Sequence, residues 1–299
     1  MNTPSTPSWD LYRSFLAVLK NGSLSAAARE LGLAQPTLGR HIEALEQAVG
    51  YALFIRSQHG YLPTEQALHL QPYCEALAAN ASALLRAASS AGDQARGTVR
   101  ISASEVIGCE VLPPILARLH QDYPGLHIEL SLSNQAQDLL KREADIAVRM
   151  VRPAQEALVA KRIGNIELGL HAHRDYLARR GTPGSLEDLR QHAIIGFDHE
   201  NAFIRSLKGK LGGLTRDAFS LRSDSDLAQL AAIRAGFGIG ICQVALARRE
   251  AQLVRVLPGV FSLQLDTWLA MHEDLRESKR CAVVFAALAA GLASYASSA

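Results

Sequence analysis

The chain has 299 residues, of which 48% are hydrophobic and 20% charged, and its formal net charge is +2. This length suffices for two or three domains with cores of their own. We find no apolar run of the ~18–20 residues that a membrane-spanning helix needs, and residues 1–8 lack a secretory signal pattern. The sequence therefore predicts a cytoplasmic protein that does not contact the membrane.

The four cysteines are widely spaced and form neither a Cys-x-x-Cys pair nor a cluster with zinc spacing. They are Cys74, Cys109, Cys242 and Cys281. We expect buried or unreactive thiols and no metal site, and a thiol-based redox switch is the alternative.

Two short helical patterns open the chain. The first begins after Ser8, as a capping residue, and ends at Asn21-Gly22, where both residues tolerate left-handed dihedral angles. The second is capped by Ser23 and ends at Gly32, and its alanines allow another helix to approach closely. A tight turn then joins it to a third helix, so residues 23–42 read as a helix-turn-helix.

The third helix carries the clearest pattern, with Pro36 in its first turn and one apolar stripe. The stripe consists of Leu38, Ile42, Leu45 and Val49. Polar side chains on the other faces are of the types that hydrogen-bond base edges and phosphates. The candidate DNA contacts of this motif are Ser23, Ser25, Gln35, Pro36, Thr37, Arg40 and His41. A merely solvated helix face is the alternative for them.

A hairpin follows, with a strand over 53–56, a turn over 57–60 and a return strand over 61–63. Arg56 and His59 lie on or near this wing, within reach of phosphate or the minor groove, and complete a winged helix-turn-helix domain over residues 1–63. Residues 1–65 contain five basic and five acidic side chains, which sum to zero. Such a head binds DNA weakly through charge alone and needs more than one copy.

Thr64 can cap a long helix that runs to about Ala91, with Pro72 inside it to bend it. This helix is rich in small apolar residues and has few charges. Packing against a second copy of the chain is the natural way to bury it. We assign residues 64–96 to this dimerisation helix and a hinge.

Strands and helices alternate from residue 97 to the end, which predicts an α/β domain with parallel sheets covered by helices. The expected strands cover 99–103, 126–132, 145–149, 166–171, 193–197, 238–241 and 265–271, and the expected helices 111–120, 135–142, 227–235 and 276–295. Ligands in such folds bind at the carboxyl ends of strands.

Polar side chains at those strand ends are the candidate ligand contacts of this domain. They are Ser102, Ser104, Glu105, Ser133, Asn134, Arg149, Phe197 and Asp224. Helix capping is the alternative for the serines, surface pairing for the arginine and core packing for the phenylalanine. The charges at these positions are of mixed sign and do not define the ligand; we expect a small polar or carboxylate-bearing molecule.

An enzyme is not expected, because the sequence lacks a G-x-S-x-G elbow and a phosphate-binding loop. The glycines of residues 236–240 do not form G-x-G-x-x-G and are better explained as turns around a strand. A solute-binding protein with a helical extension is a further alternative, but it predicts a signal peptide.

These motifs resemble those of the LysR-type transcriptional regulators over nearly the whole chain. The resemblance is carried by 22–32, Gln35-Pro36, 40–42, Leu45-Glu46, Leu53-Phe54, Arg56 and 62–65, and further along by 112–114, Tyr123-Pro124, 144–149 and 235–240. It implies a DNA-binding regulator without a cofactor, whose promoter binding is modulated by a small-molecule effector.

The resemblance also implies how the chain is arranged. The effector domain, 97–299, is expected to form two lobes like a periplasmic binding protein, joined by two crossing strands. Lobe one is expected over 98–164 and 267–299, and lobe two over 165–266. The long helix is expected to form an antiparallel dimer within a tetramer that binds an interrupted inverted repeat near a promoter, and the effector to bind between the lobes.

One position departs from the family pattern, because Gly39 stands where the recognition helix usually carries serine. This glycine removes a hydrogen-bonding hydroxyl and costs the helix about 0.5–1 kcal/mol relative to alanine. We expect it to alter sequence preference and leave the DNA-binding role intact.

Overall fold

The computed structural model describes residues 6–57, 60–88, 95–134, 144–153, 158–200, 204–205, 209–210 and 212–298, without the side chains of 86–88. Its contacts divide the chain into an N-terminal unit that ends at Ala87 and a C-terminal unit that begins at Ala88. The long helix that we assigned to a segment of its own groups with the N-terminal unit.

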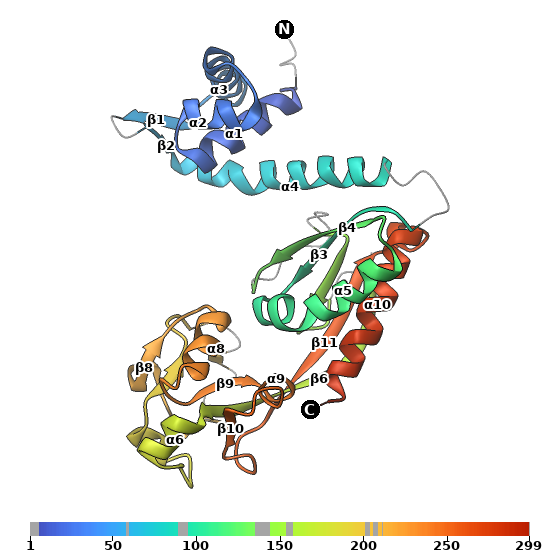
Figure 1. Cartoon of the computed structure of the whole chain (residues 1–299). Helices are drawn as coiled ribbons and strands as arrows, with labels where there is room; N and C mark the ends of the chain where they lie inside the picture. The colour runs from blue at the N-terminus through green and yellow to red at the C-terminus, as the bar shows by residue number, and fades with distance from the viewer. Residues whose placement is uncertain are drawn as a thin grey trace. The chain divides into compact units, whose positions relative to one another are not determined.

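The N-terminal unit is a three-helix cluster with a two-stranded wing and a long helix (Figure 1). Its elements are α1 (Trp9–Asn21), α2 (Leu24–Leu31), α3 (Gln35–Val49), β1 (Phe54–Ser57), β2 (Gly60–Pro63) and α4 (Glu65–Ala88). Left-handed glycines end the first three helices, at Gly22, Gly32 and Gly50. The predicted order of elements is confirmed.

Two of the three predicted helix-capping residues cap their helix through the side chain. The Ser23 hydroxyl accepts a hydrogen bond from the Ala26 amide at 3.5 Å, and the Thr64 hydroxyl accepts one from the Ala67 amide at 3.2 Å. Ser8 occupies the N-cap position of α1, as predicted, but its side chain makes no capping bond. The first turn of α1 instead carries Asp10, whose charge favours the positive end of the helix dipole.

Helix α4 continues through Pro72 and exposes a series of large apolar side chains. They are Leu68, Tyr73, Leu77, Leu84 and Leu85, which are 43–74% exposed. An exposed apolar series along one helix indicates a surface for another protein.

The C-terminal unit is built on a seven-stranded sheet in which β10, β6, β11, β5, β3 and β4 follow one another and β9 also pairs with β6. The strands are β3 (Gly97–Ala103), β4 (Leu126–Leu132), β5 (Ile146–Arg149), β6 (Leu158–His173), β9 (Gly240–Gln243), β10 (Leu253–Val256) and β11 (Leu263–His272). Parallel pairing is confirmed for β3 with β4 and with β5. The other pairs of this sheet are antiparallel, so the expectation of parallel sheets holds for only part of it.

The antiparallel pairs have a physical origin in the two long strands β6 and β11. They pair over ten positions, from Leu263 with Leu168 to His272 with Leu158, and pass between the two lobes (Figure 1). One strand leaves lobe one and the other returns to it, so they run in opposite directions. The two crossing strands implied by the resemblance are thus present.

Lobe two adds a small parallel pair and several short helices. These elements are α6 (Arg174–Arg180), β7 (Ile194–Gly196), β8 (Phe219–Arg222), α8 (Asp226–Arg234) and α9 (Val244–Ala247). Gly238 lies so close to the chain that an added Cβ would be 2.2 Å from the Ala193 carbonyl oxygen. Close backbone approach therefore explains this glycine. The helix predicted over 135–142 lies outside the described residues.

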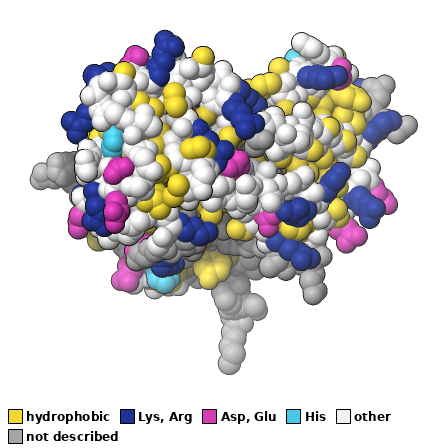
Figure 2. All heavy atoms as spheres, turned by 90° about the horizontal axis from the view of Figure 1, so that it is seen from below, with side chains coloured by type: hydrophobic (Ala, Val, Ile, Leu, Met, Phe, Trp, Pro, Cys, Tyr) yellow, Lys and Arg dark blue, Asp and Glu magenta, His cyan; other side chains and the backbone are white. Residues whose placement is uncertain are grey.

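Helices α5 (Leu112–Asp122) and α10 (Lys279–Ala296) pack against each other and contribute to the core of lobe one, after a π-helical turn, η1 (Ile107–Val111). By length and composition α10 is the one helix of the described residues that is long and apolar enough to span a membrane, although Lys279 and Arg280 shorten its apolar run. Val284, Leu288 and Leu292 are buried in the lobe-one core, which accounts for its apolar composition. On the face drawn in Figure 2, basic and acidic side chains are interspersed with apolar patches.

Candidate functional site

The polar side of α3 faces solvent because the apolar stripe on its other side is buried. Leu38 and Leu45 are fully buried and Ile42 is 3% exposed, so the opposite face is turned to solvent. Gln35 and Arg40 are exposed there. Pro36 and Glu43 are also exposed, and Thr37 and His41 are half-buried on the flank.

Arg40 is the available cation of this face. Within residues 6–57 and 60–88, its guanidinium makes no hydrogen bond or ion pair with a described side chain. Gln35 accepts a hydrogen bond from the Ser25 hydroxyl at 3.0 Å, which joins the starts of α2 and α3. Arginine can bind guanine with two hydrogen bonds and glutamine can bind adenine, so this end of α3 has the chemistry to read bases.

His41 lies differently from the other predicted contacts. Its Nδ1 is 2.7 Å from the hydroxyl of Ser14, a residue of α1 that is 1% exposed. The imidazole is therefore used to hold α3 against α1, and one of its nitrogens is not available to DNA. The polar Ser14 in an apolar stripe was the signal in the sequence that pointed to this bond.

The wing carries Arg56, whose Nη2 is 3.2 Å from a carboxylate oxygen of Glu43 on α3. The same guanidinium lies 5.7 Å from the centre of the Tyr61 ring. Both ionic side chains are well exposed, so this pair contributes little stability and can be exchanged for phosphate. His59 lies outside the described residues.

Two residues that the sequence analysis missed fix the wing to the helices. Glu46 accepts backbone hydrogen bonds from Leu53 at 2.7 Å and Phe54 at 3.2 Å. Gly60 has a φ of +119°, and a Cβ added to it would be 2.3 Å from the Gly22 carbonyl oxygen. That carbonyl accepts the amide of the next residue, Tyr61, at 2.8 Å.

In the C-terminal unit, Ser102 and Arg149 are brought together at the ends of neighbouring strands. The Arg149 guanidinium donates to the Ser102 hydroxyl at 3.2 Å and to its carbonyl oxygen at 3.3 Å. Ser102 is fully buried and Arg149 is half-buried. The bonds link β3 to β5, so these two candidates bind each other.

Glu105 and Asn134 contact lobe two. The Ser225 hydroxyl donates to Glu105 at 2.9 Å, and the Asn134 amide donates to Asp226 at 2.9 Å. Asn134 also accepts the backbone amide of Glu105 at 3.0 Å. We call these four residues the inter-lobe latch.

Burial, with the nearby Glu105 charge, raises the pKa of Asp226 to about 6. The Asn134 hydrogen bond opposes this rise. The latch therefore contains one carboxyl that changes charge near neutral pH.

The remaining cleft candidates are at the predicted strand ends. Ser104 directly follows β3 and is half-buried, and its carbonyl accepts the Gly108 amide at 2.8 Å. Ser133 follows β4, with its amide donating to Ala103 at 3.0 Å. Phe197 follows β7 and is half-buried.

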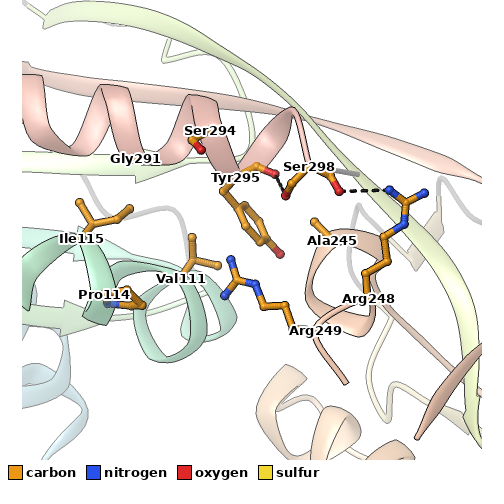
Figure 3. Close-up of a pocket in the computed structure, with 10 residues that line it drawn as sticks. All are labelled: Val111, Pro114, Ile115, Ala245, Arg248, Arg249, Gly291, Ser294, Tyr295 and Ser298. Atoms are coloured by element: carbon orange, nitrogen blue, oxygen red, sulfur yellow. Dashed lines mark hydrogen bonds between the residues drawn. The ribbon is translucent and has the colours of Figure 1, made fainter. Parts of the chain in front are cut away.

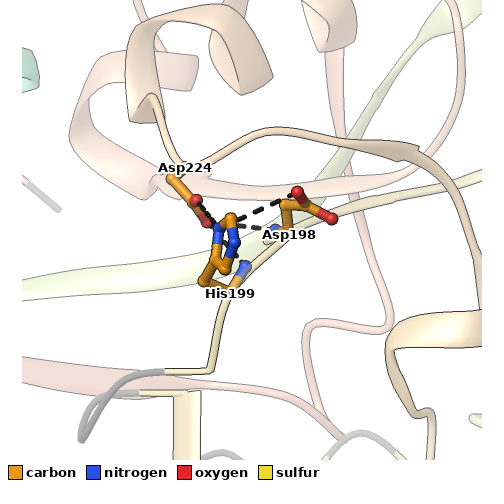
Figure 4. Close-up of side chains that lie close together, drawn as sticks. All are labelled: Asp198, His199 and Asp224. Carbon is orange, nitrogen blue, oxygen red and sulfur yellow. Dashed lines mark hydrogen bonds and ion pairs between the residues drawn. The ribbon is translucent and has the colours of Figure 1, made fainter.

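Asp224 clusters with Asp198 and His199 (Figure 4) and directly precedes Ser225 of the latch. Its carboxylate accepts the backbone amides of both residues and lies 2.6 Å from His199 Nδ1. These bonds lower the pKa of Asp224 and raise that of His199. Arg216 pairs with Asp198 at 2.5 Å. The cluster therefore has its own cations, and Asp224 shapes a loop there.

Cys74, Cys242 and Cys281 are buried and Cys109 is exposed. Desolvation raises the pKa of the Cys74 thiol to about 11 and that of Cys242 to about 12, and it also raises that of Cys281. Thiolate is the reactive form, so these three positions disfavour redox chemistry.

Two family models match the chain. The model described as "Bacterial regulatory helix-turn-helix protein, lysR family" covers residues 9–68, and the "LysR substrate binding domain" covers residues 92–293. The first spans the helices and the wing, and the second spans both lobes.

Individual relatives give the same result. An HTH-type transcriptional regulator of Xanthomonas campestris pv. campestris is 28% identical over 64% of this chain and 58% of its own length. The probable regulator LtrA of Klebsiella pneumoniae is 27% identical over 87% of each chain. Among solved structures, full-length CbnR in complex with its target DNA has a TM-score of 0.66, at 18% identity, over 95% of this chain and 99% of CbnR.

Proposed function

Because the chain belongs to the LysR family of bacterial transcriptional regulators, we propose that its paired heads bind an interrupted inverted repeat near a promoter. The observation that carries this proposal is the exposed face of α3, where Arg40 is unpaired among the described residues opposite a buried apolar stripe. An exposed helix with such side chains fits the major groove. CbnR, which has the same fold, has been solved on its target DNA.

We assign different tasks to the residues of this face. Gln35, Thr37 and Arg40 contact base edges, with Pro36 beside them at the helix start. Ser23, Ser25 and Arg56 contact phosphates, and for Arg56 this requires exchange of its Glu43 partner. The half-buried His41 supports α3 from behind through Ser14.

The exposed apolar side chains of α4 support dimerisation through this helix. A head with balanced charge gains affinity when two copies bind one site, because the second contact becomes intramolecular. We infer a dimer through α4 and a tetramer as the working unit, located with the chromosome in the cytoplasm.

The cleft between the lobes is proposed to bind a small polar or carboxylate-bearing effector, without a cofactor. The residues proposed to surround it are Ser102, Ser104, Glu105, Ser133, Asn134, Arg149 and Phe197. Several of them are hydrogen-bonded to one another, so an effector competes with these internal bonds. Binding of the effector then controls transcription by changing the spacing or bending of the DNA, and no catalysis is involved.

The test is Arg40→Ala, measured by fluorescence anisotropy on the DNA site mapped for the wild-type protein. We expect affinity to fall about tenfold to a hundredfold, because one bidentate base contact contributes ~1–3 kcal/mol. Arg13→Ala removes one exposed charge from α1 and serves as the matched control. Equal affinity of Arg40→Ala and wild type, with unchanged oligomeric state, would remove Arg40 from the base-reading set.

A further inference from the structure

A cavity of about 410 Å³ lies where α9 meets the ends of α5 and α10 (Figure 3). Val111, Ile115, Ser294 and Tyr295 line it from lobe one, and Arg248 and Arg249 line it from the chain that follows α9. Its volume falls in the range of small-molecule sites. None of the cleft candidates lines it, so it is separate from the cleft.

The cavity is cationic. Arg248 donates to the Ser298 carbonyl oxygen at 3.1 Å and Arg249 to the Glu110 carbonyl oxygen at 3.2 Å. Among the described residues neither guanidinium has a carboxylate within ion-pair distance, and none of the residues that line the cavity is acidic. Each guanidinium has five N–H donors, so both retain donors for an anion.

Arg249 is held in place before any ligand arrives. Its guanidinium lies 4.9 Å from the centre of the Tyr295 ring, and Figure 3 shows it below that ring. Tyr295 is 4% exposed, and its hydroxyl donates to Gln243 at 2.5 Å. A cation fixed on a buried ring loses little conformational freedom on binding, which favours affinity.

The opposite wall is apolar. Val111 is 3% exposed and Ile115 is half-buried, and both side chains face the cavity from η1 and α5. Gly291 permits this close packing, because a Cβ there would be 2.5 Å from Ile115 Cδ1. One end of the cavity therefore suits a negative charge and the other a hydrocarbon group.

We propose that this cavity is a second ligand site, which binds a small monocarboxylate with an apolar body. The carboxylate pairs with Arg249, and the apolar body lies against Val111 and Ile115, while Arg248 adds positive charge at the rim beside Ser298. Hydroxyl groups of Ser294 and neighbouring residues at the rim remain in contact with solvent.

The position of the site links it to the junction of the lobes. Arg234 of α8 donates to Glu110 at 2.7 Å and 3.0 Å and to Glu250 at 2.6 Å and 2.9 Å. The backbone carbonyl of the same Glu110 accepts Arg249. A ligand on Arg249 thus acts one residue away from an ion pair that joins lobe two to lobe one.

The test is isothermal titration of the full-length protein with phenylacetate and with its neutral isostere phenylacetamide. We expect saturable binding of phenylacetate and at least tenfold weaker binding of the amide, because only the anion can pair with the guanidinium groups. Arg249→Gln and Ser294→Trp should each weaken phenylacetate binding at least tenfold, the first by removing charge and the second by filling the space from an exposed position.

Two controls separate this site from others. Arg276→Gln removes an exposed charge before the far end of α10 and should leave binding unchanged. Ser104→Ala changes the proposed cleft and should also leave phenylacetate binding unchanged. The proposal is overturned if phenylacetate does not bind saturably, or if its affinity survives Arg249→Gln and Ser294→Trp, or if only Ser104→Ala reduces it. Each of these outcomes leaves the DNA-binding assignment of Arg40 untouched.

Discussion

The two units present their polar candidates in opposite states. On α3 the Arg40 guanidinium is exposed and has no partner among the described residues. In the cleft, Ser102 is bonded to Arg149, and Asn134 is bonded to Asp226. The DNA-reading face is therefore open to a ligand, whereas the cleft is held by its own hydrogen bonds.

The difference indicates which existing contacts each ligand has to displace when it binds. At Arg40, DNA meets a side chain that has only water to lose, whereas Arg56 and Gln35 must exchange exposed partners, Glu43 and Ser25. At the proposed cleft site, an effector has to replace hydrogen bonds within and between the lobes, and bonds that include a charged group contribute about 1.5–3 kcal/mol each. On this proposal, effector affinity depends on the stability of the latch as well as on contacts with the ligand.

The largest effect is expected at the wing, where Gly60→Ala tests whether the N-terminal unit keeps its DNA-reading face in place. The new Cβ meets the Gly22 carbonyl oxygen at 2.3 Å and the φ of +119° is strained for alanine. We expect the N-terminal unit to lose about 2 kcal/mol or more of its free energy of unfolding, and DNA affinity to fall with it. Thermal unfolding followed by circular dichroism measures this loss.

Gly50→Ala is the matched control for Gly60→Ala. Its φ is +83°, yet nothing lies within 4 Å of the added Cβ. It should therefore cost only the dihedral strain, about 1–2 kcal/mol. Equal costs for the two variants would show that the contact with Gly22 is unimportant.

A smaller effect is expected from the inter-lobe latch, and it tests whether the cleft is held by its own hydrogen bonds. The pKa of Asp226 is about 6 in the folded protein, above its ordinary value of about 3.9 in an unfolded chain. The folded state therefore binds more protons between these two values, and stability falls as pH rises from about 4 to about 6 and then levels off.

Asp226→Asn should remove that slope and raise stability at pH 7 by eliminating the charge beside Glu105. Urea unfolding at a series of pH values provides the measurement. Asp122→Asn, an exposed position on α5, should keep the wild-type slope. A slope that persists in Asp226→Asn would assign it to another group.

The smallest effect sharpens the description of the reading helix. A Cβ at Gly39 would have only Leu24 Cδ1 within 4 Å, at 3.9 Å, so Gly39→Ala fits without a clash. We expect a gain of about 0.5–1 kcal/mol in stability, from the helix propensity of alanine. Gly32→Ala, with a φ of +67°, should instead lose stability, and a loss at Gly39 as well would show that α3 needs this glycine.

Periodicity predicted the elements whose faces differ most in polarity. The stripe of α3 was found because burial and exposure alternate with the helical period. The first half of β6 was missed, because Lys161 and Arg162 lie exposed in it and interrupt the apolar run. Strand direction was predicted incompletely, because apolar patterns carry no information on whether a long strand returns.

Which side chains bind each other could not be predicted from the sequence. Ser102 and Arg149 are 47 positions apart, and Asn134 and Asp226 are 92 apart, so only the sheet register and the lobe closure bring them together. The cavity beside α9 was missed for the same reason, since its arginines and Tyr295 come from distant segments. Individual candidates at strand ends were found, but which of them bind each other was not.

The bonds that tie the wing to the helices have a consequence for regulation. Gly60 rests on Gly22, and Glu46 holds the backbone of the first wing strand, so each head is one stiff piece. A stiff head keeps its own shape when the assembly rearranges. In the proposed dimer, one variable is then left to adjust, the separation of the two heads along the duplex. Helical phasing reads that separation in turns of ~10–10.5 base pairs.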